Sequence, residues 1–184
     1  MTDGAASHPG SQDWPPPRLA AERLGELFQA IECLGGTLGD VTWLGHPDGW
    51  LGAQDQRAIA ARVADLCRAR GAQALFAPAT EDHHEDHKTT ARIARMVAAS
   101  VPGLVLYSYS VWGRWDDPCF LSRIARHMPV ALNTGPWRQA KRAAIAAHAT
   151  QLGRVVHDDP AGFAMSAAFV DAFADTPEIY WRAR

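Results

Sequence analysis

The stretch Gln73–Lys88, QALFAPATEDHHEDHK, decides the fold, because it joins a short apolar run to a dense group of charged and imidazole side chains. The apolar part, Ala74–Pro78, has the length and composition of a buried β-strand. The polar part, Thr80–Lys88, follows it closely, and a helical pattern then continues to about Ser100. A strand that leads through a polar turn into a helix predicts an α/β protein.

Two further runs on either side have the composition of strands, Val41–Leu44 before this stretch and Leu104–Tyr109 after it. The three runs begin roughly thirty residues apart with a helical pattern in each gap, which is the spacing of successive βαβ units. We therefore expect a mostly parallel sheet. No internal repeat or domain-sized linker interrupts the chain, so a single domain over residues 1–184 is predicted.

The rest of the sequence predicts helices and loops around this sheet. Thr2–Arg18 is rich in Gly, Ser and Pro and is expected to be a loop through Pro17. Residues 113–136 should be irregular apart from one short helical stretch. The remaining apolar periodicities predict amphipathic helices over Leu19–Leu34, Ile59–Cys67, Trp137–Leu152 and Phe163–Phe173.

Composition excludes several classes of protein. The 184 residues carry 18 basic and 20 acidic side chains, a net charge of -2, which gives no electrostatic footprint for nucleic acid. No apolar run approaches the roughly 18 residues of a membrane span, and the first residues lack the pattern of a signal peptide. Three widely spaced cysteines suit a reducing compartment. A cytoplasmic protein is predicted, with no nucleic-acid partner and no membrane span.

The polar turn has the residue types of a metal site. Parallel sheets bind ligands beyond the carboxyl ends of their strands, and Gly45–Gly52 and Thr80–Lys88 both fall there. His84 and His87 are three residues apart, so a helix that begins here presents both rings on one face. A catalytic zinc takes His and carboxylate ligands, and Asp86 could accept a ring N–H. The alternative is a solvated, charged helix start.

His84–His87, HEDH, resembles the HPDH-type motif of the PIG-L/LmbE family of zinc-dependent N-deacetylases, the GlcNAc-PI de-N-acetylase-like proteins. Other segments resemble family motifs in the same order along nearly the whole chain. They are Thr2–Gly4 with Ser7–Gly10, the pair Arg23 and Glu26, Leu44–Gly49, Val111–Trp112, and Lys141–Gln151.

The resemblance implies a Rossmann-like three-layer α/β fold and a hydrolase that removes an acyl group from an N-acyl amino sugar or a glycosylated small molecule. His87 would ligate Zn2+ or another divalent metal, and His84 would steady the tetrahedral intermediate and protonate the leaving amine. Asp86 would orient His84. The substrate site would include Asp48, Asp3 and Ser7.

The chain departs from the family pattern in one respect, since the AHPDDE motif is absent. The first strand and helix of the family are expected to be missing, which makes the predicted fold N-terminally incomplete and leaves catalytic activity open. One alternative makes His46, Asp48 and His87 a surrogate zinc set. Another is a non-catalytic fragment or small-molecule-binding module without an assembled metal site.

Overall fold

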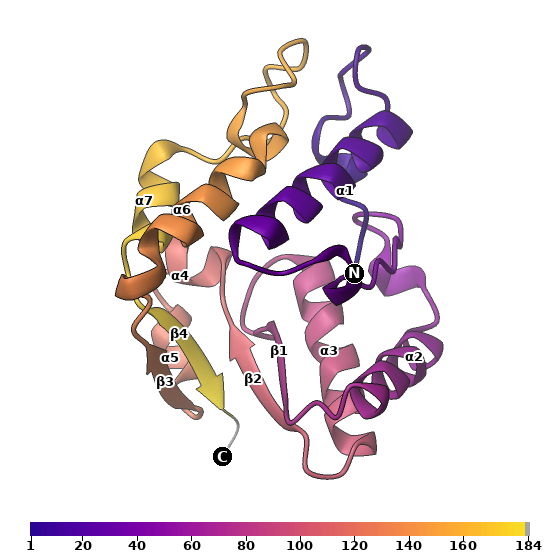
Figure 1. Ribbon diagram of the computed structural model, residues 1–184, viewed down its shortest axis with the longest axis vertical. Helices are drawn as coiled ribbons and strands as arrows, with labels where there is room; N and C mark the ends of the chain where they lie inside the picture. The colour runs from indigo at the N-terminus through magenta and orange to yellow at the C-terminus, as the bar shows by residue number, and fades with distance from the viewer. Residues whose placement is uncertain (183–184) are drawn as a thin grey trace. The chain divides into compact units, whose positions relative to one another are not determined.

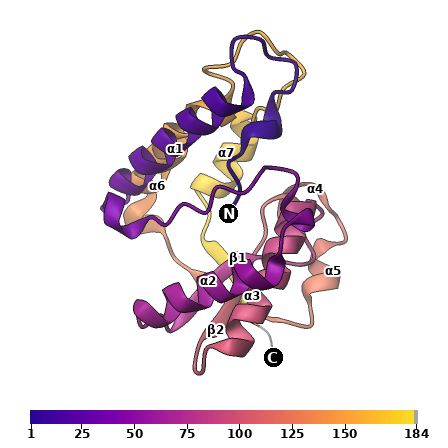
Figure 2. The ribbon, with the colours of Figure 1, turned by 90° about the vertical axis from the view of Figure 1, so that its right-hand side faces the viewer.

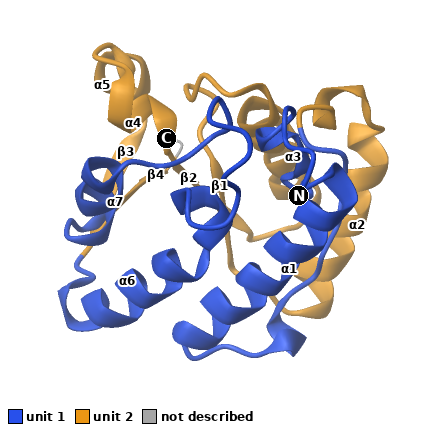
Figure 3. Cartoon of the chain, turned by 90° about the horizontal axis from the view of Figure 1, so that it is seen from above, with its two compact units in different colours: residues 1–48, 133–178 blue, residues 49–132, 179–184 orange. Residues whose placement is uncertain are grey.

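The structure is a computed structural model that describes residues 1–182 as two compact units (Figures 1 and 3). Unit 1 contains residues 1–48 and 133–178, and unit 2 contains residues 49–132 and those from 179 onward. The mixture of helices and a sheet confirms the predicted α/β class. The strand and histidine motif that open the sequence argument both lie in unit 2.

The sheet of unit 2 has the strand order β1-β2-β4-β3 in the described residues. β1 (Ala74–Pro78) and β2 (Val105–Tyr109) are parallel, with Phe76 opposite Tyr107. β4 (Glu178–Arg182) runs antiparallel to β2, and β3 (Met128–Leu132) completes the order. The predicted strands at 74–78 and 104–109 are therefore confirmed.

The expectation of a mostly parallel sheet is wrong, because the sheet is mixed. β4 comes from the last residues of the chain and returns against β2 in the opposite direction. Its sequence, EIYWR, has Ile, Tyr and Trp in succession, and β-branched and aromatic residues favour a strand. The expectation that residues 113–136 are irregular apart from one short helical stretch is also incomplete, because that segment contains β3 and two short helices.

Helices cover the β1 and β2 strands of unit 2 (Figure 1). α3 (Glu85–Ser100) packs on both strands, and α2 (Gln56–Ala69), capped by the Asp55 side chain, packs on α3. α3 buries Ile93 and Val97 completely, as its 3.6-residue periodicity predicts. The two short helices are α4 (Trp112–Asp116) and α5 (Phe120–Ile124). Phe120 of α5 forms a core cluster with Trp181 of β4.

Unit 1 is built from helices that pack along one another (Figure 2). α1 (Pro16–Cys33) packs against α6 (Arg138–Ala147), and α6 contacts α7 (Ala167–Ala174). Leu19 of α1 is fully buried. Over the residues that the structure describes, no helix of either unit is long and apolar enough to cross a membrane.

Two helix boundaries differ from the sequence expectation for physical reasons. α1 begins at Pro16 within the proline run, because the first turn of a helix needs no backbone N–H donors and suits the fixed φ of proline. The expected helix over Trp137–Leu152 is divided, since α6 ends at Ala147 and a 3-10 turn, η5 (Ala149–Leu152), follows. The division turns Thr150 toward α1.

The predicted strand at Val41–Leu44 is wrong. This run follows a 3-10 turn, η2 (Leu38–Asp40), and has no ladder partner in the described part of the chain. A single parallel bridge forms instead between Thr2 and His46. The amide of Asp3 donates to the His46 carbonyl at 2.9 Å, so this bridge anchors the N-terminal residues beside Pro47–Gly49, the PDG turn.

Candidate functional site

Asp82 is the buried centre of the turn that follows β1. Its side chain has 0% exposure. One carboxylate oxygen accepts a hydrogen bond from the His84 amide at 3.2 Å. The other accepts hydrogen bonds from the amides of Val111 and Trp112, both at 3.1 Å, and from the Ser110 hydroxyl at 3.3 Å. Asp82 therefore ties the carboxyl ends of β1 and β2 together.

His87 lies beside this carboxylate. Its Nδ1 is 3.3 Å from Asp82 Oδ1, which is an ion-pair distance, but Nδ1 is buried and lacks a properly aligned hydrogen bond. Burial alone would raise the pKa of Asp82, yet the His87 ring and the amides of His84 and Val111 hold that pKa far below its usual value. A permanent negative charge thus faces the inner nitrogen of His87.

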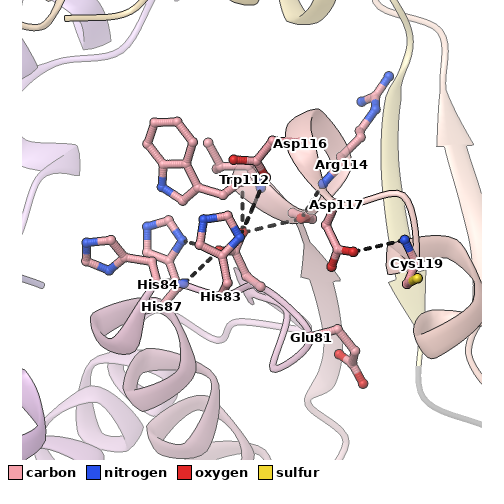
Figure 4. A network of polar contacts seen from close by, with 12 residues as sticks. Glu81, His83, His84, His87, Trp112, Arg114, Asp116, Asp117 and Cys119 are labelled. Carbon is pink, nitrogen blue, oxygen red and sulfur yellow. Dashed lines mark hydrogen bonds and ion pairs between the residues drawn. The ribbon is translucent and has the colours of Figure 1, made fainter. Parts of the chain in front are cut away.

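His84 forms the N-cap of α3. The ring nitrogen Nδ1 accepts a hydrogen bond from the Asp86 amide at 3.2 Å, in the way that side-chain acceptors satisfy the first free amides of a helix. The His84 and His87 rings lie 4.7 Å apart, which confirms that the helix start presents both on one side (Figure 4). His84 is exposed.

Asp86 faces another part of unit 2. Its two carboxylate oxygens accept hydrogen bonds from the amides of Gly49 at 2.7 Å and Leu51 at 3.2 Å, and the residue has only 5% exposure. The carboxylate therefore fixes Gly49, the last residue of the PDG turn, and Leu51 against the first turn of α3. Asp86 meets the His84 ring through its backbone amide, whereas the sequence interpretation assigned that contact to the carboxylate.

The histidine pair provides part of a metal site. A metal-ligating histidine commonly has a carboxylate at its other ring nitrogen, and the buried contact of His87 Nδ1 with Asp82 has that form. A catalytic zinc takes three protein ligands, however. Among residues 1–182 no group of three or more His, Cys, Asp or Glu side chains is arranged to hold a metal ion. The described residues therefore fit one histidine ligand and not a complete zinc site.

Three residues predicted from the sequence to bind substrate lie near the N-terminus of unit 1 or its PDG turn. Asp3 Oδ1 accepts hydrogen bonds from the amides of Ala5 at 3.0 Å and Asp48 at 3.1 Å. The Asp48 carboxylate in turn accepts one from the Ala6 amide at 3.2 Å. Asp3 and Asp48 are thus brought together, while the Ser7 hydroxyl is 2.8 Å from His8 Nδ1.

Arg23 was matched to a family motif but was not among the predicted site residues. Its guanidinium donates to the Gly4 carbonyl at 2.5 Å and to the Thr150 hydroxyl at 3.3 Å. The third nitrogen, Nη2, is buried without a hydrogen-bond partner. Burial lowers the pKa of Arg23, and the nearby carboxylates of Asp48, Glu26 and Asp3 oppose that change.

His83 and Trp112 extend the polar network of unit 2 on its exposed side (Figure 4). His83 Nδ1 lies 3.6 Å from Asp116 Oδ1, and its ring centroid is 6.4 Å from that of Trp112. Neither His83 nor Asp82 was a predicted site residue. The available signal for Asp82 was its position, since it is an acidic residue directly between a strand and a histidine pair.

These features define an α/β protein in which a buried carboxylate supports a histidine pair at the ends of two parallel strands. A family model for GlcNAc-PI de-N-acetylase, PIG-L, matches residues 1–98, which is more than half of the chain. The chain therefore belongs to the PIG-L family, as its motifs predict. No curated protein matches the chain.

Proposed function

We propose that this protein is a metal-dependent amide hydrolase that removes the acyl group from an N-acyl amino sugar or a related glycosylated small molecule. In that reaction water adds to the acyl carbonyl, the C–N bond breaks, and the leaving nitrogen takes a proton. The observation that carries the proposal is the pair of rings, His84 and His87, held 4.7 Å apart over the buried carboxylate of Asp82.

His87 is proposed as a ligand of Zn2+ or another divalent metal. The ionised Asp82 carboxylate favours a proton on the facing Nδ1, which leaves the Nε2 lone pair for the metal. Such a metal would supply a water molecule of lowered pKa as the nucleophile. Asp82 is a positioning residue in this proposal, because it acts through the His87 ring.

His84 is proposed as the proton donor to the leaving amine. Because its Nδ1 accepts the Asp86 amide, the neutral ring carries its proton on Nε2, the nitrogen that the cap leaves free. Nε2 passes this proton to the leaving nitrogen and takes up the proton that the attacking water releases, so the transfer balances. The ring is exposed and can reach a bound substrate. In acylated amines the nitrogen must be protonated as the C–N bond breaks, so a positioned imidazole contributes on the order of 10²-fold or more.

On the substrate side we propose Asp48, Asp3 and Ser7, as the family resemblance implies, and add Arg23. The free Nη2 of Arg23 is a buried donor without an acceptor, which costs free energy unless a ligand or water supplies one. Hydroxyl groups of a sugar are suitable acceptors. Arg23→Lys should therefore raise KM for an amino-sugar substrate more than it lowers kcat.

The test combines metal analysis with assays on N-acetylglucosamine derivatives. The purified wild-type chain should bind added zinc through His87 and release acetate when the metal is present. His87→Ala should lose the metal. His84→Ala should keep the metal and lose on the order of 10²-fold in kcat. His127→Ala is the control, because that ring contacts Glu81 rather than the histidine pair, and it should retain both properties.

Two results would contradict the proposal. Metal retained in His87→Ala would show that this ring is not a ligand. A folded wild-type chain that binds amino sugars but takes up no divalent metal would favour the alternative, a non-catalytic binding module of the same family.

A further inference from the structure

A pocket of about 430 Å³ opens in unit 1 between α6, η5 and α7. Four half-buried apolar residues, Ile145, Leu152, Met165 and Val170, form its floor, and exposed charged residues form its rim. The apolar residues are Ile145, Ala146, Leu152, Met165, Ala167 and Val170. The charged residues are Arg142, Asp171 and Arg154. None of them belongs to the proposed hydrolytic site.

Contacts between the surrounding segments fix the walls of this pocket. Arg142 of α6 donates to Asp171 of α7 at 2.9 Å and also pairs with Asp175. Behind the floor, the Met165 amide donates to the Gln151 carbonyl at 2.8 Å. The pocket is thus formed before any ligand enters, and a preformed pocket avoids the ordering cost that weakens binding.

The two arginines at the rim differ in whether a carboxylate pairs with them. Arg142 is committed to the two aspartates, which hold its pKa above the usual value. Arg154 is exposed and has no side-chain partner among residues 1–182. The backbone amide of Arg154 donates to the Ala149 carbonyl at 3.1 Å, and this hydrogen bond fixes the backbone from which the side chain extends. One guanidinium therefore remains available beside an apolar floor.

We infer that this pocket binds a small amphipathic monoanion, a carboxylate attached to an apolar body of about eight carbon atoms, a size suited to a pocket of this class. The apolar body lies on the floor formed by α6 and α7. The carboxylate pairs with Arg154, whose planar fork matches its two oxygens. This inference is independent of the proposed hydrolase function, since the two use different residues.

Calorimetric titration of the full chain tests the inference, with octanoate as the probe and octanamide as its uncharged counterpart. Octanoate should bind at one site with a dissociation constant of about 1 mM, the affinity expected for a ligand of this size. Octanamide should bind about tenfold more weakly, because it cannot pair its charge with the guanidinium.

Three variants locate the site. Arg154→Gln should weaken octanoate binding about tenfold and leave octanamide binding unchanged. Ala167→Trp, at the exposed first residue of α7, should fill the pocket and abolish binding of both probes. Arg138→Gln removes the same charge from α6 but outside this pocket, and it should bind octanoate as the wild type does.

Thermal unfolding of each variant checks that it is folded, so a loss of binding cannot be due to misfolding. Equal affinity for octanoate and octanamide would show apolar contact alone and overturn the inference. So would octanoate binding that survives both Arg154→Gln and Ala167→Trp. If octanoate shows no saturable binding at about 10 mM, ten times the expected dissociation constant, the inference is also overturned, and a macromolecular partner becomes the alternative occupant of the pocket.

Discussion

Among the described residues, each unit of this protein has a buried carboxylate beside a buried polar atom that makes no hydrogen bond, and the two arrangements differ in where the hydrogen bonds to the carboxylate originate. Asp82 in unit 2 has 0% side-chain exposure, and Glu26 in unit 1 has 3% exposure. In residues 1–182, the buried side-chain atoms without hydrogen bonds are His87 Nδ1 and Arg23 Nη2. The first lies against Asp82, and the second belongs to the cluster of Glu26.

The two carboxylates differ in how far along the chain their hydrogen-bond donors lie. Asp82 is held by amides from its own turn and from the end of the next strand, which are adjacent in any parallel βαβ unit. Glu26 is held by the amide and hydroxyl of Thr150, at 2.6 and 2.7 Å, across 124 residues of sequence. One site is therefore organised by local topology, and the other requires the two ends of unit 1 to meet.

The largest expected effect is that of Asp82→Ala. The change removes the acceptor for three amides and one hydroxyl, and leaves the buried His87 nitrogen without its carboxylate. We expect a loss of about 3 kcal/mol in the free energy of unfolding, as for other broken buried ionic networks. Urea unfolding measures it.

Asp65→Ala is the matched control in unit 2. Asp65 is exposed and, within residues 1–182, pairs only with Arg68 in the neighbouring turn of α2, so its removal should change the free energy of unfolding by less than about 0.5 kcal/mol. Equal effects of the two substitutions would show that Asp82 does not organise its site.

The same contrast explains which parts of the structure could be predicted from the sequence. β1, β2 and α3, which begins at Glu85, were predictable, because strand composition, helical periodicity and a polar turn are all local signals. The three-residue spacing predicted that His84 and His87 lie on one side, although His84 is the N-cap with extended backbone and only His87 lies within the helix. Asp82 was not singled out, since its burial depends on amides that come from the turn after β2.

Long-range contacts account for the features of the structure that the sequence did not predict. The motif resemblance included both Glu26 and the segment with Thr150, but no periodicity indicates that they pair. β4 was missed because its partner, β2, lies about seventy residues earlier in the chain, and a strand is stabilised by such pairing more than by its own composition. Val41–Leu44 shows the reverse case, in which strand composition without a partner produces no strand.

A smaller effect is expected for Thr150→Val, which tests the long-range arrangement. The substitution keeps the shape of the side chain but removes the hydroxyl that donates to Glu26 and accepts from Arg23. We expect a loss of about 1 to 2 kcal/mol in the free energy of unfolding, because a buried carboxylate loses one donor. Thr42→Val, at an exposed position of unit 1, should change it by less than about 0.5 kcal/mol. Equal values for both variants would show that the contact contributes nothing.

The smallest effect concerns Asp158, an exposed carboxylate that also closes a long-range contact in unit 1. Hydrogen bonds from the Asp13 amide, the Ser11 hydroxyl and the Gln12 amide lower its pKa from 3.8 to about 2. The charged form therefore stabilises the fold above pH 3.8, and this contribution is lost as the pH falls from there to about 2. The thermal midpoints of the wild type and Asp158→Asn should differ at neutral pH and converge over that interval. A constant difference would show that the charge is not the cause, and that the loop around Ser11 is held by shape alone.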